Sequence, residues 1–467
     1  MILQQFYLPC LSHASYVVAD ETTRAAFVVD PQRDVERYLE FARERGLSIE
    51  GVILTHFHAD FVSGHLELAA RVGARIYIGA RARPDFAHEP LADRARIERG
   101  ALSITALETP GHTPEGICLL VADAGAPRAL LTGDTLFIGD VGRPDLMASR
   151  GVSADQLARA LWKSLRTQIA PLPDDVVVYP AHGAGSACGK NMSKELSATL
   201  GAQRAVNWAL RATDEESFVR ELTQDQPSAP AYFGYDAALN RAQRPTLEQS
   251  LEKSLAPLPL ARVLELTAPG AAPERALVLD TREPDEYAAG HLVGSLNIGL
   301  SGKYASWAGA LVAPQQPLVL LCAPGRERES ALRLGRIGYD RVIGVLDGGF
   351  GALTARPDLV RRTERRDAAA FELERRLPGS AVLDVRERGE RPAGSIANSL
   401  HIPLGELARR AHELPRDRRL LVHCAGGYRS MIAASVMEAA GLTNVADLSG
   451  GFGAWKAAGL PVEVGAA

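Results

Sequence analysis

The stretch Thr55-His56-Phe57-His58-Ala59-Asp60-Phe61 places two histidines and an aspartate close together in the chain. It directly follows the apolar run Val52-Ile53-Leu54, which is typical of a buried strand. Metal sites in proteins are built from such imidazole and carboxylate groups. The pattern therefore predicts a strand that ends in a loop presenting metal ligands. The alternative is a pair of histidines that merely end a strand.

Three later segments repeat the arrangement of an apolar run followed by a polar side chain. They are Thr109-Pro110-Gly111-His112-Thr113, Leu130-Leu131-Thr132-Gly133-Asp134-Thr135, and Val176-Val177-Val178-Tyr179-Pro180-Ala181-His182-Gly183. Four occurrences of strand, loop and ligand favour a metal site over a chance cluster.

In this order, the four segments resemble the metallo-β-lactamase superfamily over roughly the first half of the chain. The resemblance implies an αββα sandwich with metal ligands gathered at one edge of its two sheets. Dinuclear members such as glyoxalase II carry the motif HxHxDH, and Phe61 stands where that motif has its last histidine. An aromatic hydrocarbon has no lone pair to donate. A second metal would keep at best Asp60, His182 and a share of Asp134, so one metal is expected.

Within the superfamily, the chain most resembles the persulfide dioxygenases, also called sulfur dioxygenases. The resemblance implies a single Fe(II) held by His56, His112 and Asp134, a set that suits oxygen chemistry at non-haem iron. It assigns supporting roles to three further side chains, which would hydrogen-bond the ligands or bound water and fix imidazole tautomers: His58, Asp60 and His182. His58 is the least fixed of these assignments, because it is a direct ligand in zinc hydrolases of the fold.

Two further segments also resemble the dioxygenase branch: Phe61-Val62-Ser63-Gly64-His65 and Gly139-Asp140-Val141-Gly142-Arg143-Pro144-Asp145. Arg143 is expected either to orient Asp134 through the backbone or to contact a carboxylate of a thiol substrate, which its fork geometry suits. The alternative is an ordinary structural ion pair.

Length, charge and cysteine usage narrow the class of protein. A chain of 467 residues suggests about three domains. The net charge of -4, with scattered Lys and Arg, argues against a nucleic-acid partner. Neither a long apolar stretch nor a basic and then apolar amino-terminal segment is present, so we expect no membrane span and no secretory signal. Five widely spaced cysteines fit a reducing compartment, and a cytoplasmic location is expected.

The second half of the chain contains an internal repeat. LVLDTRE at 277–283 matches AVLDVRE at 381–387, and LDGGF at 346–350 matches LSGGF at 448–452. Cys322 and Cys424 occupy the same place in the two copies. Each copy alternates short apolar strands with helical stretches, which predicts a parallel α/β sheet.

Cys424 opens a glycine-containing loop between a strand and a helix. The apolar run 419–423 leads into Cys424-Ala425-Gly426-Gly427-Tyr428-Arg429-Ser430, and a helical pattern follows. Backbone amides and the positive end of that helix would converge on the thiol and stabilise its thiolate. The loop resembles the active loop of the rhodaneses. This resemblance implies that Cys424 carries sulfane sulfur as a persulfide, that Arg429 closes the cradle, and that Arg386 binds substrate.

The two copies differ at these positions. The first has Glu327 where the second has Arg429, and an anion there should raise the pKa of Cys322. We therefore expect a structural or docking domain with an inert Cys322. The second copy has Gly394-Ser395-Ile396 where the family usually has Gly-His-Ile, whereas the first keeps Gly290-His291-Leu292.

The other three cysteines lie in the first half. Cys188 lies in a loop of small residues after His182, where Lys190 could favour a thiolate, and it is a candidate sulfur-accepting thiol. The alternative is a thiol that packs the loop. Cys10 and Cys118 are expected in the core.

These patterns divide the chain into three expected domains. Residues 1–248 form the iron dioxygenase domain with a helical carboxy-terminal cap, 249–362 the inactive rhodanese-like domain, and 363–467 the active one. The charged stretch 361–367 is expected to be a solvated connection.

Together, the resemblances imply a persulfide dioxygenase and sulfurtransferase of sulfide detoxification or sulfur metabolism. It would oxidise a small persulfide, with glutathione persulfide as the first candidate, with O2 to sulfite. Through Cys424 it would interconvert sulfite, persulfide and thiosulfate, in a direction that the sequence does not set. Relatives of this branch also imply a homo-oligomer.

Two alternatives remain. One is a zinc thioester hydrolase of the glyoxalase II kind fused to a rhodanese sulfur carrier. It needs a hydroxide normally shared between two metals, against which Phe61 argues. The other is a sulfur-relay or persulfide-sensing scaffold whose first domain merely binds metal.

Overall fold

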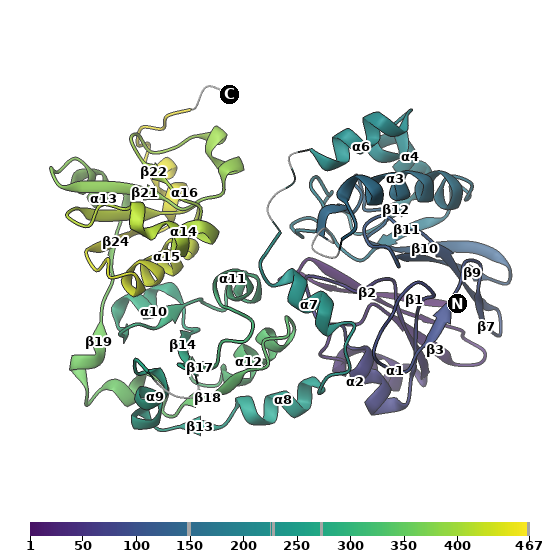
Figure 1. The fold of residues 1–467 in the computed structure, drawn as a ribbon, viewed down its shortest axis with the longest axis horizontal. Helices are drawn as coiled ribbons and strands as arrows, with labels where there is room; N and C mark the ends of the chain where they lie inside the picture. Colours follow the sequence, from purple (N-terminus) through teal and green to yellow (C-terminus); the bar gives the residue numbers. More distant parts are fainter. Residues whose placement is uncertain (147–150, 225, 227–228, 271–273, 465–467) are drawn as a thin grey trace. The chain divides into compact units, whose positions relative to one another are not determined.

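The computed structural model describes residues 1–146, 151–224, 226, 229–270 and 274–464. It divides into two compact units, Met1–Gln249 with Gly335–Gly338, and Ser250–Leu334 with Tyr339–Ala467 (Figure 1). The expected boundary after residue 248 falls beside the end of the first stretch, whereas the boundary expected after residue 362 lies within the second unit and stays a prediction.

Two six-stranded sheets form the first unit. The first has the order β1 (Ile2–Leu8), β2 (His13–Ala19), β3 (Ala25–Val29), β4 (Ser48–Leu54), β5 (Arg75–Gly79), β6 (Glu89–Leu91). The second has the order β12 (Ala198–Thr199), β11 (Val177–Pro180), β10 (Ala126–Gly133), β9 (Ile117–Asp123), β8 (Leu102–Glu108), β7 (Arg96–Arg99). Parallel pairing of β3 through β6, and of β10 with β11, places the carboxyl ends of these neighbouring strands together.

Helices cover the outer faces of both sheets. The first sheet carries α1 (Glu36–Arg45) and α2 (His65–Val72). The second carries α3 (Ala154–Ser164), which continues into a π-helical turn (Leu165–Ile169), and α4 (Leu200–Val206), α5 (Trp208–Arg211) and α6 (Glu215–Thr223). Two more helices follow, α7 (Phe233–Leu239) and α8 (Leu247–Ser254).

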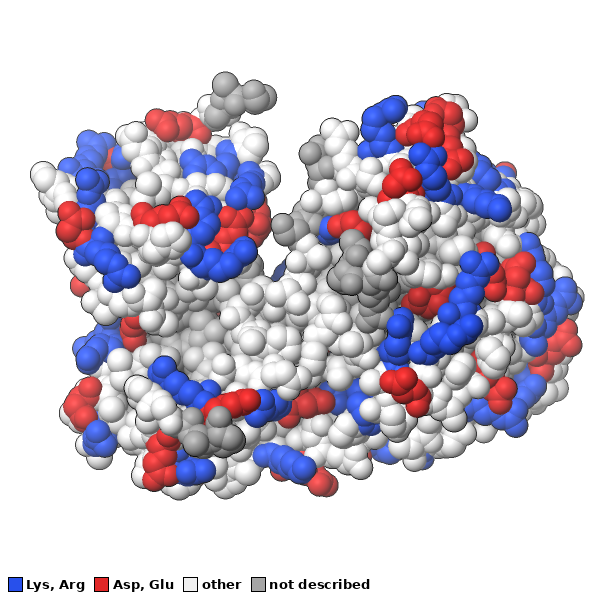
Figure 2. Space-filling view, in the orientation of Figure 1, with Lys and Arg blue, Asp and Glu red and all other residues white. Residues whose placement is uncertain are grey.

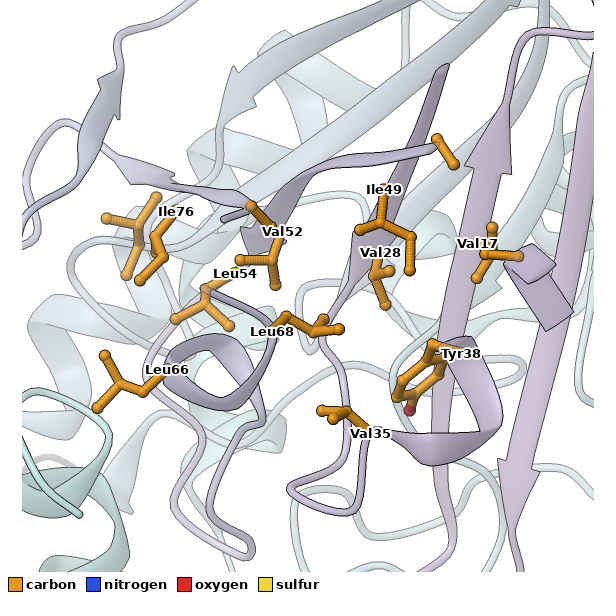
Figure 3. Packing of buried hydrophobic residues seen from close by; sticks show 14 of the residues in the cluster. Val17, Val28, Val35, Tyr38, Ile49, Val52, Leu54, Leu66, Leu68 and Ile76 are labelled. Atoms are coloured by element: carbon orange, nitrogen blue, oxygen red, sulfur yellow. The ribbon is translucent and has the colours of Figure 1, made fainter. Parts of the chain in front are cut away.

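The alternation of side chains along β4 explains this layering. Val52 and Leu54 pack outward with Tyr38 of α1 and Leu68 of α2 (Figure 3). Ile53, between them, packs inward in the cluster shared by the two sheets. Successive side chains of a strand point to opposite faces, so a strand that is buried on both faces reads as a continuous apolar run. The expected αββα sandwich is confirmed.

The second unit contains two α/β domains whose strands pair in parallel in the same order. In the first copy the sheet runs β13 (Pro257–Leu258), β18 (Val342–Leu346), β17 (Leu318–Leu321), β14 (Leu277–Asp280), β16 (Leu296–Asn297). In the second it runs β20 (Glu364–Arg366), β24 (Val445–Leu448), β23 (Arg419–His423), β21 (Ser380–Asp384), β22 (Leu400–His401). The repeat found in the sequence is therefore a repeat of the fold.

Helices complete each copy. The first has α9 (Leu260–Thr267), α10 (Pro284–Ala289), α11 (Tyr304–Leu311), α12 (Glu327–Gly335), and the two-stranded pair β15 (His291–Leu292) with β19 (Val360–Arg361). The second has α13 (Ala368–Arg375), α14 (Leu404–Arg410), α15 (Tyr428–Ala439) and α16 (Gly451–Ala457). Short 3₁₀ turns lie at Gly349–Leu353, Pro357–Leu359, Arg388–Ala393 and Ala411–Glu413.

Two further observations concern the charges on the surface and the length and polarity of the helices. On the face drawn in Figure 2, basic and acidic side chains lie interspersed on each unit. Among the described residues, every helix is too short or too polar to cross a membrane.

Candidate metal centre and cysteine loop

Three buried side chains from three loops converge at one edge of the sandwich. His56 follows β4, His112 follows β8 and Asp134 follows β10. One ligand atom from each lies within 4.8 Å of the others. The Asp134 Oδ2 atom is 3.4 Å from His112 Nε2 and 3.8 Å from His56 Nε2. The structure thus brings together the three residues expected to hold the metal.

Hydrogen bonds behind the two histidines turn their Nε2 atoms toward Asp134. His112 Nδ1 is 2.8 Å from the Arg143 carbonyl, which can only accept, so this nitrogen carries the proton. His56 Nδ1 is 2.9 Å from Thr55 Oγ1, whose own proton goes to Asp30 Oδ2 at 2.8 Å. The lone pairs of both Nε2 atoms are therefore free for a metal. Burial, with help from neighbouring imidazoles, holds the pKa of His56 well below its ordinary value and keeps the ring neutral.

His58, Asp60 and His182 form a second buried group. One ligand atom from each lies within 4.8 Å of the others. His182 Nε2 is 3.5 Å from Asp60 Oδ2 and 3.6 Å from Asp134 Oδ1. His58 Nε2 lies 3.1 Å from Asp30 Oδ1. Burial works to lower the pKa of His58, but the carboxylates of Asp30, Asp134 and Asp60 together outweigh it and the pKa is raised. His58 Nε2 thus lies beside the Asp30 carboxylate.

Phe61 is buried beside this second group. Its ring centroid is 3.9 Å from that of His13 and 4.4 Å from that of His58. His13, in turn, lies 5.5 Å from His182 between ring centroids. The side of the centre where a second metal would need another imidazole is therefore filled by a hydrocarbon ring that packs on two histidines.

Three residues of this centre escaped the sequence analysis: Asp30, Asn240 and His13. Asp30 had a readable signal, because it directly follows the apolar run of β3, as Asp134 follows that of β10. It also accepts a hydrogen bond from the Thr55 amide at 2.8 Å. Its backbone φ of 48° is unusual for a residue other than glycine.

Asn240 clamps the loop that carries His58 and Asp60. Its Nδ2 atom donates to the carbonyls of His58 at 2.8 Å and Phe61 at 2.7 Å. Its Oδ1 atom accepts from the Ser63 amide at 2.7 Å. The side chain is fully buried and lies just after α7. No local pattern marks this residue, since its partners are far away in sequence.

The expected role of Arg143 needs correction. Its carbonyl orients His112, whereas we expected it to orient Asp134. Its guanidinium is buried and paired with Asp145 at 2.6 Å, and it also donates to the Ala187 carbonyl at 3.3 Å. The ion-pair alternative is thus present, and a contact with substrate stays a prediction.

Cys188 lies at the centre, but Lys190 does not assist it. Its sulfur lies within 4.8 Å of ligand atoms of Asp134 and His182. Burial chiefly, and then Asp60 and Asp134, raise the pKa of Cys188 well above the ordinary value. The Lys190 ammonium instead donates to the Gln224 carbonyl at 3.0 Å. The expectation that Lys190 favours a thiolate at Cys188 is therefore wrong.

Of the two cysteines expected in the core, only Cys118 is there. Cys118 is fully buried in β9. Cys10 lies in a turn and is half-buried. The prediction for Cys10 was wrong because this residue lies in the turn between β1 and β2 and not in a strand.

In the second unit, Cys424 lies between β23 and α15. Its Sγ atom accepts a hydrogen bond from the Gly427 amide at 3.1 Å and lies 3.5 Å from Ser430 Oγ. Gly427 has a φ of +88°, and a Cβ at this position would come within 2.9 Å of the Gly450 amide nitrogen. Glycine is therefore required both by the backbone conformation and by the close approach.

Both arginines assigned to this loop make ion pairs within the domain. Arg429 holds Glu390 with two contacts of 2.7 Å. Arg386 pairs with Asp384 at 2.7 Å and donates to the Gly394 carbonyl at 2.9 Å. In the first copy, Arg282 makes the matching contacts with Asp280 and the Gly290 carbonyl. A contact set shared by both copies belongs to the fold, and substrate binding by Arg386 and Arg429 stays a prediction.

Cys322 occupies the matching place in the first copy, where a serine hydroxyl is a hydrogen-bond partner of the thiol. Its Sγ atom donates to Ser330 Oγ at 3.4 Å. Burial is the main cause that raises the pKa of Cys322, and Glu327 adds to it as the sequence analysis expected.

Fold and site together define a metal-binding αββα domain joined to two α/β domains with a cysteine after the central strand. Residues 8–182 match the family model of the metallo-beta-lactamase superfamily, and residues 265–356 and 369–458 match that of the rhodanese-like domain. The chain belongs to the metallo-β-lactamase superfamily, and its second unit consists of rhodanese-like domains.

Comparison with known proteins gives relatives of the first unit. A probable polyketide biosynthesis zinc-dependent hydrolase from Bacillus velezensis is 30% identical over 191 residues, which are 40% of this chain and 79% of that protein. A hydroxyacylglutathione hydrolase from Hahella chejuensis is 36% identical over 162 residues, which are 34% of this chain and 56% of that protein.

A solved structure extends the likeness beyond the first unit. The crystal structure of a metallo-beta-lactamase from Staphylococcus aureus has 31% identity and a TM-score of 0.65. The match covers 74% of this chain and 98% of that chain. This share of the chain is larger than the first unit alone.

Proposed function

We propose that the protein is a non-haem iron persulfide dioxygenase with sulfurtransferase activity. The observation that carries the proposal is the pairing of His56, His112 and Asp134 with Phe61, which fills the place of a ligand to a second metal. The dioxygenase part oxidises a small persulfide, with glutathione persulfide as the first candidate. The rhodanese-like part exchanges sulfur through Cys424.

The residues present fit a divalent metal ion. Both carboxylate oxygens of Asp134 are buried and lack a hydrogen-bond partner among the described residues. A buried carboxylate without partners is costly, and a cation would satisfy it. Two imidazoles with one carboxylate suit Fe(II). When bound, Fe(II) would supply the activation of O2.

The chain's own residues prepare this centre. Asp30, acting by way of Thr55, holds the imidazole of His56 in the tautomer that leaves Nε2 free. The Arg143 carbonyl does the same for His112. Phe61 and His13 close one side of the centre with tightly packed rings, which excludes water there. His182 and Asp60 lie beside Asp134 and can hold or pass protons.

The overall reaction balances with water as a co-reactant. A persulfide RSSH, O2 and H2O give the thiol RSH, sulfite and two protons. The terminal sulfur is oxidised and O2 is reduced by four electrons. Cys424, once loaded as a persulfide, then allows sulfite to attack its outer sulfur. That sulfur–sulfur bond breaks, thiosulfate leaves, and the thiolate of Cys424 returns. Cys188, beside Asp134, is a further candidate acceptor of sulfur.

A second candidate function has support from the relatives. The hydroxyacylglutathione hydrolase and the zinc-dependent hydrolase suggest a glyoxalase II-like thioester hydrolase. The close grouping of His58, Asp60 and His182 would serve a second metal. The contact of His58 with Asp30 and the position of Phe61 oppose it.

One experiment separates these functions. The full-length protein is purified without oxygen, its metals are measured, and O2 uptake is followed with glutathione persulfide. Stoichiometric iron with rapid uptake supports the proposal. Zinc with thioester cleavage contradicts it, and neither activity would favour a sulfur-relay scaffold. His112→Ala should lose the metal, whereas His412→Ala, at an exposed position of the second copy, should keep it.

A further inference from the structure

Helix α15, which begins at the cysteine loop, also packs against the first rhodanese-like copy. Tyr428 donates its hydroxyl proton to the Gly299 carbonyl at 2.6 Å. About two turns further along α15, Ser435 Oγ accepts a hydrogen bond from the Asn297 backbone amide at 3.1 Å. Because residues seven apart share a helix face, these contacts dock one face of α15 on the segment that follows β16 and on β16 itself.

Near the other end of α15, Glu438 extends the same contact. One of its carboxylate oxygens lies 2.9 Å from His291 Nε2, and the other accepts from the Gly294 amide at 3.1 Å. His291 is the histidine that the first copy keeps and the second has replaced with Ser395. The first copy thus uses this histidine to hold the helix of its neighbour.

Tyr428 is closely confined at this junction. Its ring packs on Gly302, where an added Cβ would come within 2.4 Å of ring carbon atoms. Burial raises the pKa of Tyr428, which keeps the hydroxyl protonated as a donor. Both the ring and the hydroxyl are therefore fixed by the first copy.

The residue before Tyr428 is the one that contacts the thiol. The Gly427 amide donates to Cys424 Sγ at 3.1 Å. The Gly427 carbonyl accepts from Arg365 Nη2 at 3.4 Å. Arg365 pairs with Asp447 at 2.8 Å in its own domain and with Asp285 of α10 in the first copy at 2.5 Å. Contacts on both sides of Gly427 therefore lead to the first copy.

We propose that the first rhodanese-like copy positions the cysteine loop of the second, with Tyr428 as the positioning residue. The bond from its hydroxyl to the Gly299 carbonyl fixes the first turn of α15, and this holds the Gly427 amide against the Cys424 sulfur. An amide that donates to a thiolate stabilises the charged form. The inference rests on the proposed function only for the role of Cys424 as sulfur carrier. It gives the first copy a task that requires no chemistry at Cys322.

The test removes the hydroxyl alone. In the full-length protein, Tyr428→Phe is compared with Tyr339→Phe, whose buried hydroxyl donates to the Val312 carbonyl at 2.7 Å within the first copy. The rate of Cys424 alkylation by iodoacetamide is measured from pH 5 to pH 10 by peptide mass spectrometry, together with the melting temperature. Losing alignment of one amide donor should slow alkylation of Tyr428→Phe at neutral pH about threefold or more. In Tyr339→Phe, Cys424 should be alkylated at the rate of the wild type, even if both variants have a lower melting temperature.

A second pair of variants tests the ring contact. Gly302→Ala pushes a methyl group against Tyr428, whereas Gly351→Ala adds one where nothing lies within 4 Å. Gly302→Ala should slow Cys424 alkylation, and Gly351→Ala should not. Wild-type alkylation profiles in both Tyr428→Phe and Gly302→Ala would overturn the inference. Slower alkylation in a protein that transfers no sulfur from thiosulfate would support the positioning role and remove only the proposed sulfurtransferase function.

Discussion

Phe61 is the residue on which our proposal of a single metal depends. Replacing it with histidine restores the ligand that the dinuclear motif has, next to Asp60 and His182. Phe61→His should therefore raise bound metal from one toward two ions per chain, measured by elemental analysis after reconstitution with Zn²⁺. O2 uptake with a persulfide should fall at the same time.

A matched substitution separates the ligand from the disruption it causes. Phe41→His puts an imidazole among the apolar residues between α1 and the first sheet, and should cost stability without adding metal. If a folded Phe61→His protein keeps the metal content of the wild type, Phe61 is not what excludes the second ion. The contacts that His58 makes with His13 and with Asp30 would then exclude it.

His423 predicts a pH dependence of stability in the second copy. This histidine is fully buried before Cys424, and burial lowers its pKa from about 6.5 to about 4. Between these pH values the unfolded chain binds a proton and the folded one does not. The contribution of neutral His423 to the free energy of unfolding is therefore fully present above pH 6.5. It is lost as the pH falls toward 4, by about 1.4 kcal/mol per pH unit.

The sequence of the first copy supplies the variant that tests this dependence, since Leu321 occupies the place of His423. His423→Leu should gain stability relative to the wild type as the pH is lowered, by roughly 2 kcal/mol between pH 7 and pH 5. Thermal unfolding at both pH values measures it. A constant difference between variant and wild type would show that His423 is not buried in its neutral form.

At the scale of elements, the segment after α7 holds the loop after β4. Asn240 makes two donor bonds and one acceptor bond to that loop, and an aspartate there keeps only acceptors. Asn240→Asp should weaken metal binding about tenfold or more, as losing a group that orients ligands does. Competition with a chelator for Co²⁺ gives the affinity, and the Co²⁺ absorption spectrum reports the change in geometry.

Asn444→Asp serves as the control, because Asn444 is exposed and lies in the second unit. It should leave both the affinity and the spectrum unchanged. Equal Co²⁺ affinities and identical spectra for the two variants would show that the clamp supports the fold without shaping the metal centre.

Sequence alone predicted the elements that carry their own pattern. The apolar run of β4, its ligand-bearing loop and the duplicated α/β domain all follow from local periodicity and repetition. Asn240 could not be predicted, because its partners lie some 180 residues earlier in the chain. For the same reason Lys190 was misjudged, since only the fold shows that its ammonium reaches the Gln224 carbonyl. Arg386 was interpreted through resemblance, and only the matching Arg282 shows that its ion pair belongs to the fold.

At the scale of the whole molecule, the two activities that we propose lie in two units and should separate by mutation. Cys424→Ser removes the proposed sulfur carrier and leaves the metal centre untouched. The variant should consume O2 with glutathione persulfide at the rate of the wild type but lose sulfur exchange between thiosulfate and sulfite, followed with labelled sulfite. Cys322→Ser should retain both activities. Exchange that survives in Cys424→Ser would transfer the carrier role to Cys322 or Cys188.

The docking of α15 on the first copy also bears on how the protein unfolds. Helix α15 belongs to the second copy, and its residues Tyr428, Ser435 and Glu438 contact the first copy. Unfolding of either copy therefore exposes part of the core of both. In calorimetry, the two rhodanese-like domains should share one cooperative endotherm despite having separate sheets. Mutations in the first copy would then shorten the lifetime of the second, so that a domain to which we assign no chemistry governs the heat stability of the copy that carries Cys424.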